Sequence, residues 1–128
     1  MAKLPLTISV SQIKGKGRGK KLGIPTFNFK IPNNLKLRHG VYAGWLINED
    51  KKYAAAIHFG PRPQFAETDT SLEAFILDKE IPEITTGATL EFVKFIRKIK
   101  LFSSVNHMLK QIEKDVEEIR NFLLQQNN

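Results

Sequence analysis

The sequence contains no cysteine, which excludes disulfides and thiolate-bound metals. No apolar run approaches the roughly 18 residues of a transmembrane helix, and the stretch before Thr7 does not have the apolar segment of a signal peptide. With six Pro and eight Gly among 128 residues, the composition is neither collagen-like nor typical of disorder. We therefore expect a single domain over residues 1–128, located in the cytoplasm and without a membrane partner.

Positive charge is concentrated in the first half of the chain. Residues 1–60 carry eleven Lys/Arg and two acids, whereas residues 61–128 carry nine Lys/Arg and eleven acids. Six of the cations lie between Lys14 and Lys30. A basic segment of this kind favours an anionic partner, namely a phosphorylated small molecule, a nucleic acid or a membrane surface. A solvated surface segment has the same composition, so charge alone does not decide between an anion-binding segment and a solvated one.

Six segments show the period-two alternation of apolar and polar residues that is typical of half-buried strands. They are residues 6–13, 26–29, 40–47, 52–59, 71–77 and 88–96. The third and fourth are joined by a short acidic tip, which predicts a hairpin. Short strands separated by turns, with no helix between them, predict a mainly β domain built as an antiparallel barrel or sandwich.

The period changes after Ser103, which with Ser104 offers a helix cap. Apolar residues then recur at steps of three and four, in one stripe of an α-helix. The stripe is Val105, Met108, Leu109, Ile112, Val116, Ile119 and Leu123. We expect one C-terminal helix that covers an open end or face of the sheet.

Glycine alternates with cations in the stretch 15–21 (GKGRGKK). It is not a P-loop, because no Ser or Thr follows a Gly-Lys pair, and Pro25 and a strand follow where a dinucleotide-binding motif has a helix. Alternate glycines let backbone N–H groups converge on an anion, and the cations beside them add charge. The stretch predicts a phosphate-binding loop; a flexible hairpin loop and a clamp on an RNA backbone are the alternatives.

Two candidate sites lie on predicted strands. Thr26 and Asn28 share one strand face, while Phe27 and Phe29 point to the core, and two neutral oxygens so placed suit a Mg²⁺ that takes its other ligands from phosphates and water. Glu73 shares a face with apolar residues, which makes it a candidate for a partly desolvated general base. A polar strand face and an edge-strand charge are the structural alternatives.

Arg97 lies between the last strand and the helix, where it can hold an anion or carbonyl of a ligand under the helix. The three histidines, His39, His58 and His107, have no metal-ligand spacing, and we interpret them as structural. No Ser/His/Asp or Cys/His constellation is present.

Taken together, the segments resemble the riboflavin kinase family over residues 5–124. The family's motifs are matched, in order, by the paired stretches 15–19 (GKGRG) and 22–29 (LGIPTFNF), and by 40–43 (GVYA), 60–65 (GPRPQF), 72–78 (LEAFILD), 97–102 (RKIKLF) and 109–115 (LKQIEKD). The resemblance implies a six-stranded antiparallel Greek-key barrel with one C-terminal helix. It also implies transfer of the γ-phosphate of ATP to the 5′-hydroxyl of riboflavin, with Mg²⁺, to give FMN.

The resemblance also assigns roles to residues. Glu73 is the base that accepts the proton of the hydroxyl, and Thr26 and Asn28 hold Mg²⁺. ATP binding is expected at Gly15, Gly17, Lys20, Lys21, Pro25, Thr26 and Asn28. Riboflavin and FMN binding is expected at Arg97, Phe102, Met108, Leu109 and Ile112.

In bacteria such a domain is commonly joined to an FMN adenylyltransferase domain, for which 128 residues leave no room. The chain is then either a free-standing kinase or a domain excised from a longer protein, with the adenylyltransferase as a separate domain or protein. We expect a monomer and no nucleic-acid partner. Ile99 stands where the family usually has an acid, which removes an expected partner of Arg97, and Thr86 replaces a usual aromatic. These two departures leave open a flavin- or nucleotide-binding module with impaired catalysis. The basic segment 14–30 leaves open a small RNA-binding β-barrel.

Overall fold

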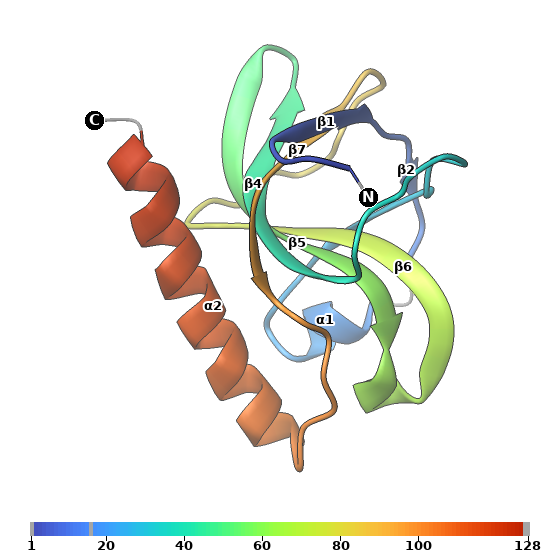
Figure 1. The fold of residues 1–128 in the computed structure, drawn as a ribbon, viewed down its shortest axis with the longest axis vertical. Coiled ribbons are helices and arrows are strands. Elements are labelled where there is room, and N and C mark those ends of the chain that lie inside the picture. The colour runs from blue at the N-terminus through green and yellow to red at the C-terminus, as the bar shows by residue number, and fades with distance from the viewer. Residues whose placement is uncertain (1, 16, 127–128) are drawn as a thin grey trace.

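The structure is a computed structural model that describes residues 2–15 and 17–126. Strands contain more of the described residues than helices do, and one long helix follows the last strand (Figure 1). The elements are β1 (Leu6–Ser9), β2 (Gln12–Ile13), α1 (Arg18–Lys21), β3 (Phe27–Phe29), β4 (Gly40–Asn48), β5 (Lys51–Arg62), the 3₁₀ turn η1 (Pro63–Phe65), β6 (Glu67–Ile76), β7 (Thr89–Arg97) and α2 (Val105–Gln126). None of the helices within these ranges combines the length and apolarity needed to cross a bilayer.

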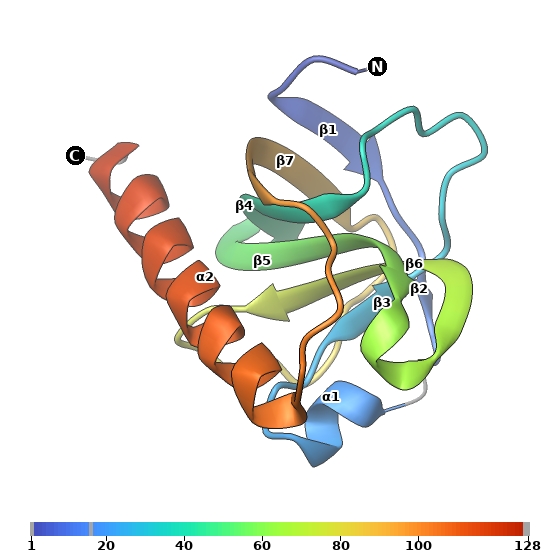
Figure 2. The ribbon, with the colours of Figure 1, turned by 60° about the horizontal axis from the view of Figure 1, so that its bottom comes forward.

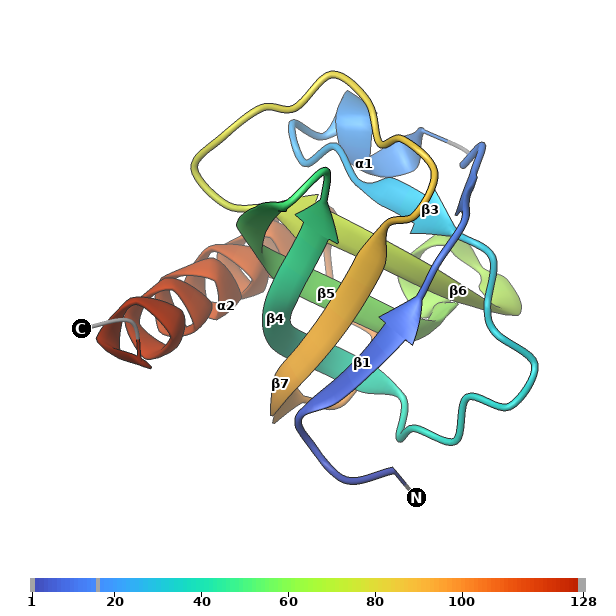
Figure 3. The ribbon, with the colours of Figure 1, turned by 90° about the horizontal axis from the view of Figure 1, so that it is seen from above.

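The strands form one curled sheet in the order β1-β7-β4-β5-β6-β3-β2, in which every pair is antiparallel. Figure 3 shows β1, β7 and β4 side by side. The predicted mainly β class and C-terminal helix are confirmed. The described sheet has seven strands where six were predicted, because the segment 6–13 is divided at Val10. Its first part pairs with β7 and its second with β3, so this segment supplies both ends of the sheet.

The concave side of the sheet holds the main core. Along β6, Leu72, Ala74 and Ile76 point into this core and are almost completely buried. Phe29, from the short strand β3, is also buried there, as its alternation predicted. Tyr42 adds its ring, which meets Phe92 edge-on at 5.3 Å between centroids. The residues between these positions on β6 therefore face the convex side.

The convex side packs against α2, which runs obliquely along the outside of the sheet (Figure 1). Ile119 and Leu123 are fully buried against Val41, Ala43 and Leu77 of the sheet side. The C-terminal half of the predicted apolar stripe thus makes the second core. Near the start of the helix, Met108 is buried whereas Val105 is exposed. This half of α2 extends past the second core toward the glycine-rich segment.

The glycine-rich segment contains one helical turn, α1, which the sequence did not predict. Gly17 precedes it with φ 69°, a left-handed conformation that glycine adopts without strain. The turn is closed by backbone bonds from Leu22 and Ile24 to the carbonyl of Gly19, at 3.0 and 2.7 Å. Figure 2 shows α1 beside the first turns of α2. Lys16, one of the predicted loop cations, lies outside the described residues.

Candidate active site

A row of paired residues crosses the convex face of the sheet. Asn28 of β3 is paired with Glu73 of β6, Glu73 with His58 of β5, His58 with Val41 of β4, and Val41 with Arg97 of β7. Directly paired residues of antiparallel strands project their side chains to the same side. The register therefore brings an amide, a carboxylate, an imidazole and a guanidinium into one line, next to the N-terminal half of α2.

Glu73 is held in a dense set of hydrogen bonds. Its Oε1 accepts from Thr26 Oγ1 at 2.8 Å, and its Oε2 accepts from Arg62 Nε at 2.7 Å and from Ser71 Oγ at 2.8 Å. The side chain is 12% exposed. Burial alone raises the pKa of Glu73, but the Arg62 guanidinium and the two hydroxyls outweigh it and hold the pKa below its usual value. The carboxylate is therefore ionised at neutral pH and fixed in direction.

The two predicted oxygen ligands lie beside this carboxylate. Thr26 donates to Glu73, and Asn28 is the register partner of Glu73. Both side chains therefore lie on the same face, as predicted, and this is the convex face of the sheet. Gly15 lies against the Asn28 amide so closely that a Cβ there would stand 2.0 Å from Nδ2. The glycine segment can approach the strand only because this residue has no side chain.

Two adjoining pockets meet at Glu73. The glycine-side pocket lies between α1, β3 and β6, and the helix-side pocket lies between the sheet, η1 and α2. Among the predicted site residues, the first is lined by Gly15, Gly17, Lys20, Pro25, Thr26 and Asn28. The second is lined by Arg97, Phe102, Met108 and Ile112. Both are lined by Ile24, Thr26, Arg62, Phe65, Glu73, Met108 and Ile112.

Two of the predicted binding residues are not brought to these pockets. Lys21 ends α1 and is exposed, and Leu109 is half-buried on α2, but neither lines the glycine-side or the helix-side pocket. Leu109 follows Met108 by one residue, and a step of one turns a helical side chain by about a quarter of the circumference. Helical periodicity identified the stripe but not which of its members faces the pocket.

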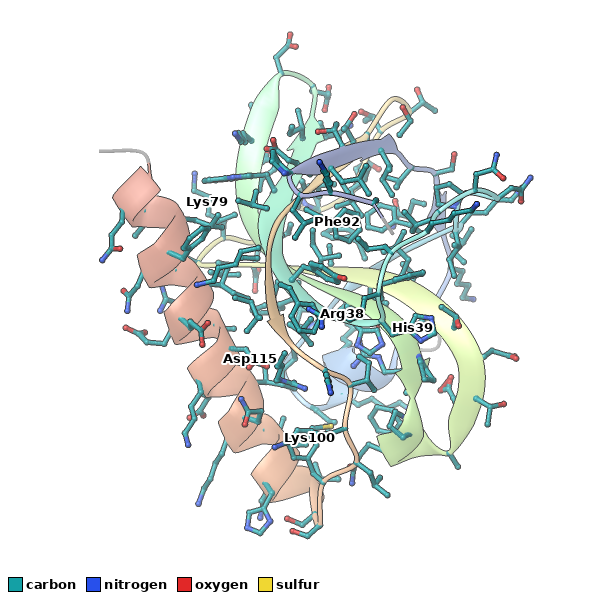
Figure 4. The ribbon with its side chains drawn as sticks, viewed as in Figure 1. Arg38, His39, Lys79, Phe92, Lys100 and Asp115 are labelled. Carbon is teal, nitrogen blue, oxygen red and sulfur yellow. The ribbon has the colours of Figure 1, made fainter. Side chains whose placement is uncertain are left out.

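Arg97 has a partner that the sequence did not reveal. Its Nε donates to both carboxylate oxygens of Asp115 at 3.0 and 2.9 Å, and Nη2 lies 2.8 Å from Oδ2. Asp115 lies between α2 and the sheet (Figure 4) and is 4% exposed. The loss of an acid at Ile99 therefore does not leave Arg97 unpaired, because α2 supplies the carboxylate. This pair fixes the helix over the pocket.

A strap of residues 98–104 connects β7 to α2 and closes the far side of the helix-side pocket. Gln64 of η1 accepts a hydrogen bond from the backbone N–H of Phe102 at 2.9 Å through its Oε1. The Phe102 ring lies 5.5 Å from the Arg97 guanidinium carbon and 5.2 Å from Lys100 Nζ. The strap thus presents an aromatic face and positive charge to the pocket.

Three side chains around Glu73 were missed as site residues. Arg62 stands in the stretch GPRPQF but was given no role. Ser71 precedes Glu73 by two on the same strand face, a spacing that could have singled it out. His58 was interpreted as structural, yet it lies in the polar row and lines the helix-side pocket. Burial lowers the pKa of His58 to about 4, and the charge of Arg62 acts in the same direction, so the ring is neutral at pH 7.

The oxygen atoms around the Glu73 carboxylate are of the kind that binds a hard cation, such as one that also binds phosphates. No cluster of three or more His, Cys, Asp or Glu side chains suited to a metal occurs among the described residues. The Thr26 hydroxyl, the Asn28 amide and the Glu73 carboxylate are oxygen donors on one face, open to the glycine-side pocket. Such a partial set fits Mg²⁺ delivered with a nucleotide.

The fold and the site together define a mainly β domain with a buried carboxylate between a glycine-lined pocket and a helix-covered pocket. Residues 2–123 match the family described as Flavokinase, riboflavin kinase. The chain is 30% identical to the human riboflavin kinase over an alignment of 128 positions that covers 94% of this chain and 82% of that protein. This chain belongs to the riboflavin kinase family.

Longer bacterial proteins also match. The bifunctional riboflavin kinase/FMN adenylyltransferase of Buchnera aphidicola is 30% identical over 121 residues, 92% of this chain and 39% of that protein. The RNA-binding riboflavin kinase RibR of Bacillus subtilis is 28% identical over 110 residues, 85% of this chain and 47% of that protein. A crystal structure described as a macrolide-efflux protein from Streptococcus pneumoniae superposes with a TM-score of 0.77 at 26% identity, over 91% of this chain and 39% of that one. The chain thus spans about two-fifths to one-half of these relatives.

Proposed function

We propose that this chain transfers the γ-phosphate of ATP to the 5′-hydroxyl of riboflavin and so makes FMN. Membership of the riboflavin kinase family supports the activity. The observation that carries the proposal is the position of Glu73, an ionised and oriented carboxylate where the two pockets adjoin. A donor phosphate in one pocket and an acceptor hydroxyl from the other meet at this carboxylate.

The reaction has a simple balance of bonds. The ribityl 5′-oxygen forms a bond to the γ-phosphorus while the bond from that phosphorus to the β–γ bridging oxygen breaks. Its electron pair stays on the terminal phosphate of ADP. Glu73 accepts the proton of the hydroxyl and later releases it to solvent. Because the transition state is loose, the protein's main contributions are to position the two reactants and to neutralise charge.

The glycine-side pocket is the proposed ATP site. Gly15 and Gly17 let backbone N–H groups approach the phosphates, and Lys20 adds a cation at the pocket wall. Thr26 and Asn28 are the proposed holders of Mg²⁺, which when bound neutralises phosphate charge. Pro25 lines the same pocket and fixes the backbone just before Thr26.

The helix-side pocket is the proposed flavin site. Met108 and Ile112 of α2 face Phe75 of the sheet across it, and this apolar gap suits the flat isoalloxazine ring. Phe102 offers an aromatic face at one side. Arg97, already fixed by Asp115, is placed to meet a carbonyl at the ring's polar edge.

Incubation of the purified chain with riboflavin, ATP and Mg²⁺, followed by chromatography, tests the proposal directly. Formation of FMN and ADP in equal amounts is the expected result. Binding of riboflavin without turnover would instead support the alternative of an impaired binding module.

The alternative hypothesis of RNA binding rests on the basic segment 14–30 and on the name of the Bacillus subtilis relative. Single-strand binders stack bases on exposed aromatic rings beside cations. Phe27 packs against the main core and Phe29 is 2% exposed, so neither serves that purpose. The absence of a nucleic-acid partner stays a prediction, and a titration with single-stranded RNA over a range of salt concentrations tests it.

A further inference from the structure

Arg62 is a charged residue at the pocket junction to which the mechanism above gives no role. It ends β5, where the pairing with β6 shifts register between Gly60 and Arg62, and Pro63 begins η1 directly after it. Its side chain lines both the glycine-side and the helix-side pocket. The guanidinium therefore sits where a phosphoryl group must pass from one pocket to the other.

Only one edge of this guanidinium is occupied within the described residues. Nε donates to Glu73 Oε2 at 2.7 Å, and the terminal nitrogens Nη1 and Nη2 have no hydrogen-bond partner among those residues. No buried side-chain nitrogen or oxygen in the described chain lacks a partner, so these two nitrogens are open to solvent in the pocket. The side chain is 24% exposed. A guanidinium held at Nε with its terminal N–H groups free is preorganised for a phosphate.

The other described cations of the two pockets differ from Arg62 in this respect. Arg97 is engaged by Asp115 through Nε and Nη2 and by the carbonyl of Lys98 through Nη1. Lys14 and Lys20 line the glycine-side pocket alone and are exposed. Lys100 lines the helix-side pocket alone and is exposed, with its Nζ over the Phe102 ring at 5.2 Å. Arg62 thus combines a fixed orientation, free donors and contact with the carboxylate that faces the reacting hydroxyl.

We propose that Arg62 is a catalytic residue whose terminal N–H groups bind the phosphoryl group being transferred, both as the γ-phosphate of ATP and as the phosphate of FMN. The inference rests on the proposed kinase function. During transfer the 5′-oxygen bonds to phosphorus, the bridging oxygen departs with its electron pair to ADP, and the proton goes to Glu73. Arg62 neutralises the equatorial oxygens throughout, and its bond to Glu73 keeps it beside the attacking oxygen.

The test compares FMN with riboflavin, which differ by that one phosphate. Arg62→Gln keeps a donor toward Glu73 but removes the cation, and Arg62→Ala removes both. We expect either variant to lose about 10²–10³-fold in kcat. Affinity for FMN, followed by flavin fluorescence without nucleotide, should fall about 10–100-fold, since a charged hydrogen bond is lost. Affinity for riboflavin should stay within about threefold, and Arg62→Lys should lie between wild type and Arg62→Gln.

Lys20→Ala is the matched control, because it removes one cation from the glycine-side pocket away from the junction. It should weaken ATP binding and leave the ratio of FMN to riboflavin affinity unchanged. If Arg62→Gln left the ratio of FMN affinity to riboflavin affinity unchanged, whether both affinities fell equally or neither fell, the assignment would be overturned and Arg62 would be a structural residue. Should Arg62→Ala fail to fold, Arg62→Gln decides the matter. A wild-type chain that makes no FMN refutes the kinase function, whereas an active wild type with a fully active Arg62→Gln refutes the role of Arg62 alone.

Discussion

Replacing Asp115 by alanine tests how α2 is held on the sheet. The Asp115 carboxylate receives Nε and Nη2 of Arg97 at 2.8–3.0 Å and the amide of Gln111 at 3.0 Å. Removal of one partner from a buried ion pair costs roughly 3–5 kcal/mol, because the other charge stays behind. Arg97 is 19% exposed and keeps its bond to the Lys98 carbonyl. We therefore expect a loss of unfolding free energy at the lower end of this range, about 3 kcal/mol.

For a domain of this length, each kcal/mol lowers Tm by roughly 3–5 °C, so Asp115→Ala should melt about 10–15 °C below wild type. Trp45, the one tryptophan of the chain, packs against the second core, which includes Ile119 and Leu123 of α2, and its fluorescence reports docking of the helix. Thermal and urea melts followed at this residue give the loss. Riboflavin should bind more weakly as well, since the same helix carries Met108 and Ile112 into the pocket.

Arg120→Ala provides the comparison on the same helix. It removes ion pairs with Asp78 and Glu117, both at 2.7 Å, whose side chains are 57% and 65% exposed. Exposed pairs contribute at most about 1 kcal/mol. The reasoning is refuted if the two variants lower Tm by the same amount, because burial of the Arg97–Asp115 pair would then add nothing.

Four further predictions concern the site. Glu73→Gln should keep the fold and riboflavin binding and lose about 10²-fold in kcat, so undiminished FMN formation would make Glu73 structural. Thr26→Val combined with Asn28→Leu should weaken ATP binding in the presence of Mg²⁺ and much less in EDTA; equal losses would mean that the strand has been disturbed. Gly15→Ala places a Cβ 2.0 Å from Asn28 Nδ2, so turnover should fall by about 10²-fold while riboflavin affinity is kept. His58 has a pKa of about 4 in the fold against 6.5 ordinarily, so the unfolded chain binds more protons between these values. The contribution of His58 to stability should therefore fall, by roughly 3 kcal/mol, as pH drops from 6.5 to 4, and His58→Asn should flatten this part of a urea-melt series.

Local periodicity was sufficient to predict most of the architecture. Alternation along residues 71–77 showed which face of β6 is buried, because the strand period is two wherever the pairing partners are found. The same rule put Thr26 and Asn28 on one face. The apolar steps after Ser103 predicted α2 within about two residues of its observed start at Val105.

Contacts between distant segments could not be read from the sequence. The partner of Arg97 is 18 residues away on α2, and that of Glu73 is Arg62, on the preceding strand. Which carboxylate meets which guanidinium depends on the curl of the sheet and the angle of the helix. The division of the first strand at Val10 is equally non-local, because it follows from pairing with β7 at one end and β3 at the other.

The alternation along β6 has a consequence for how the chain selects its own strand pairing. Glu73 stands between Leu72 and Ala74, which are 1% and 0% exposed in the main core. A slip of β6 by one residue would exchange the two faces, so the carboxylate would enter the core and its apolar neighbours would face the pockets. An ionised carboxylate without partners in such a place costs many kcal/mol. Glu73, the proposed base, therefore also makes the registers shifted by one residue unfavourable. A variant with an apolar residue at 73 would lose both the base and this energetic penalty against the shifted registers.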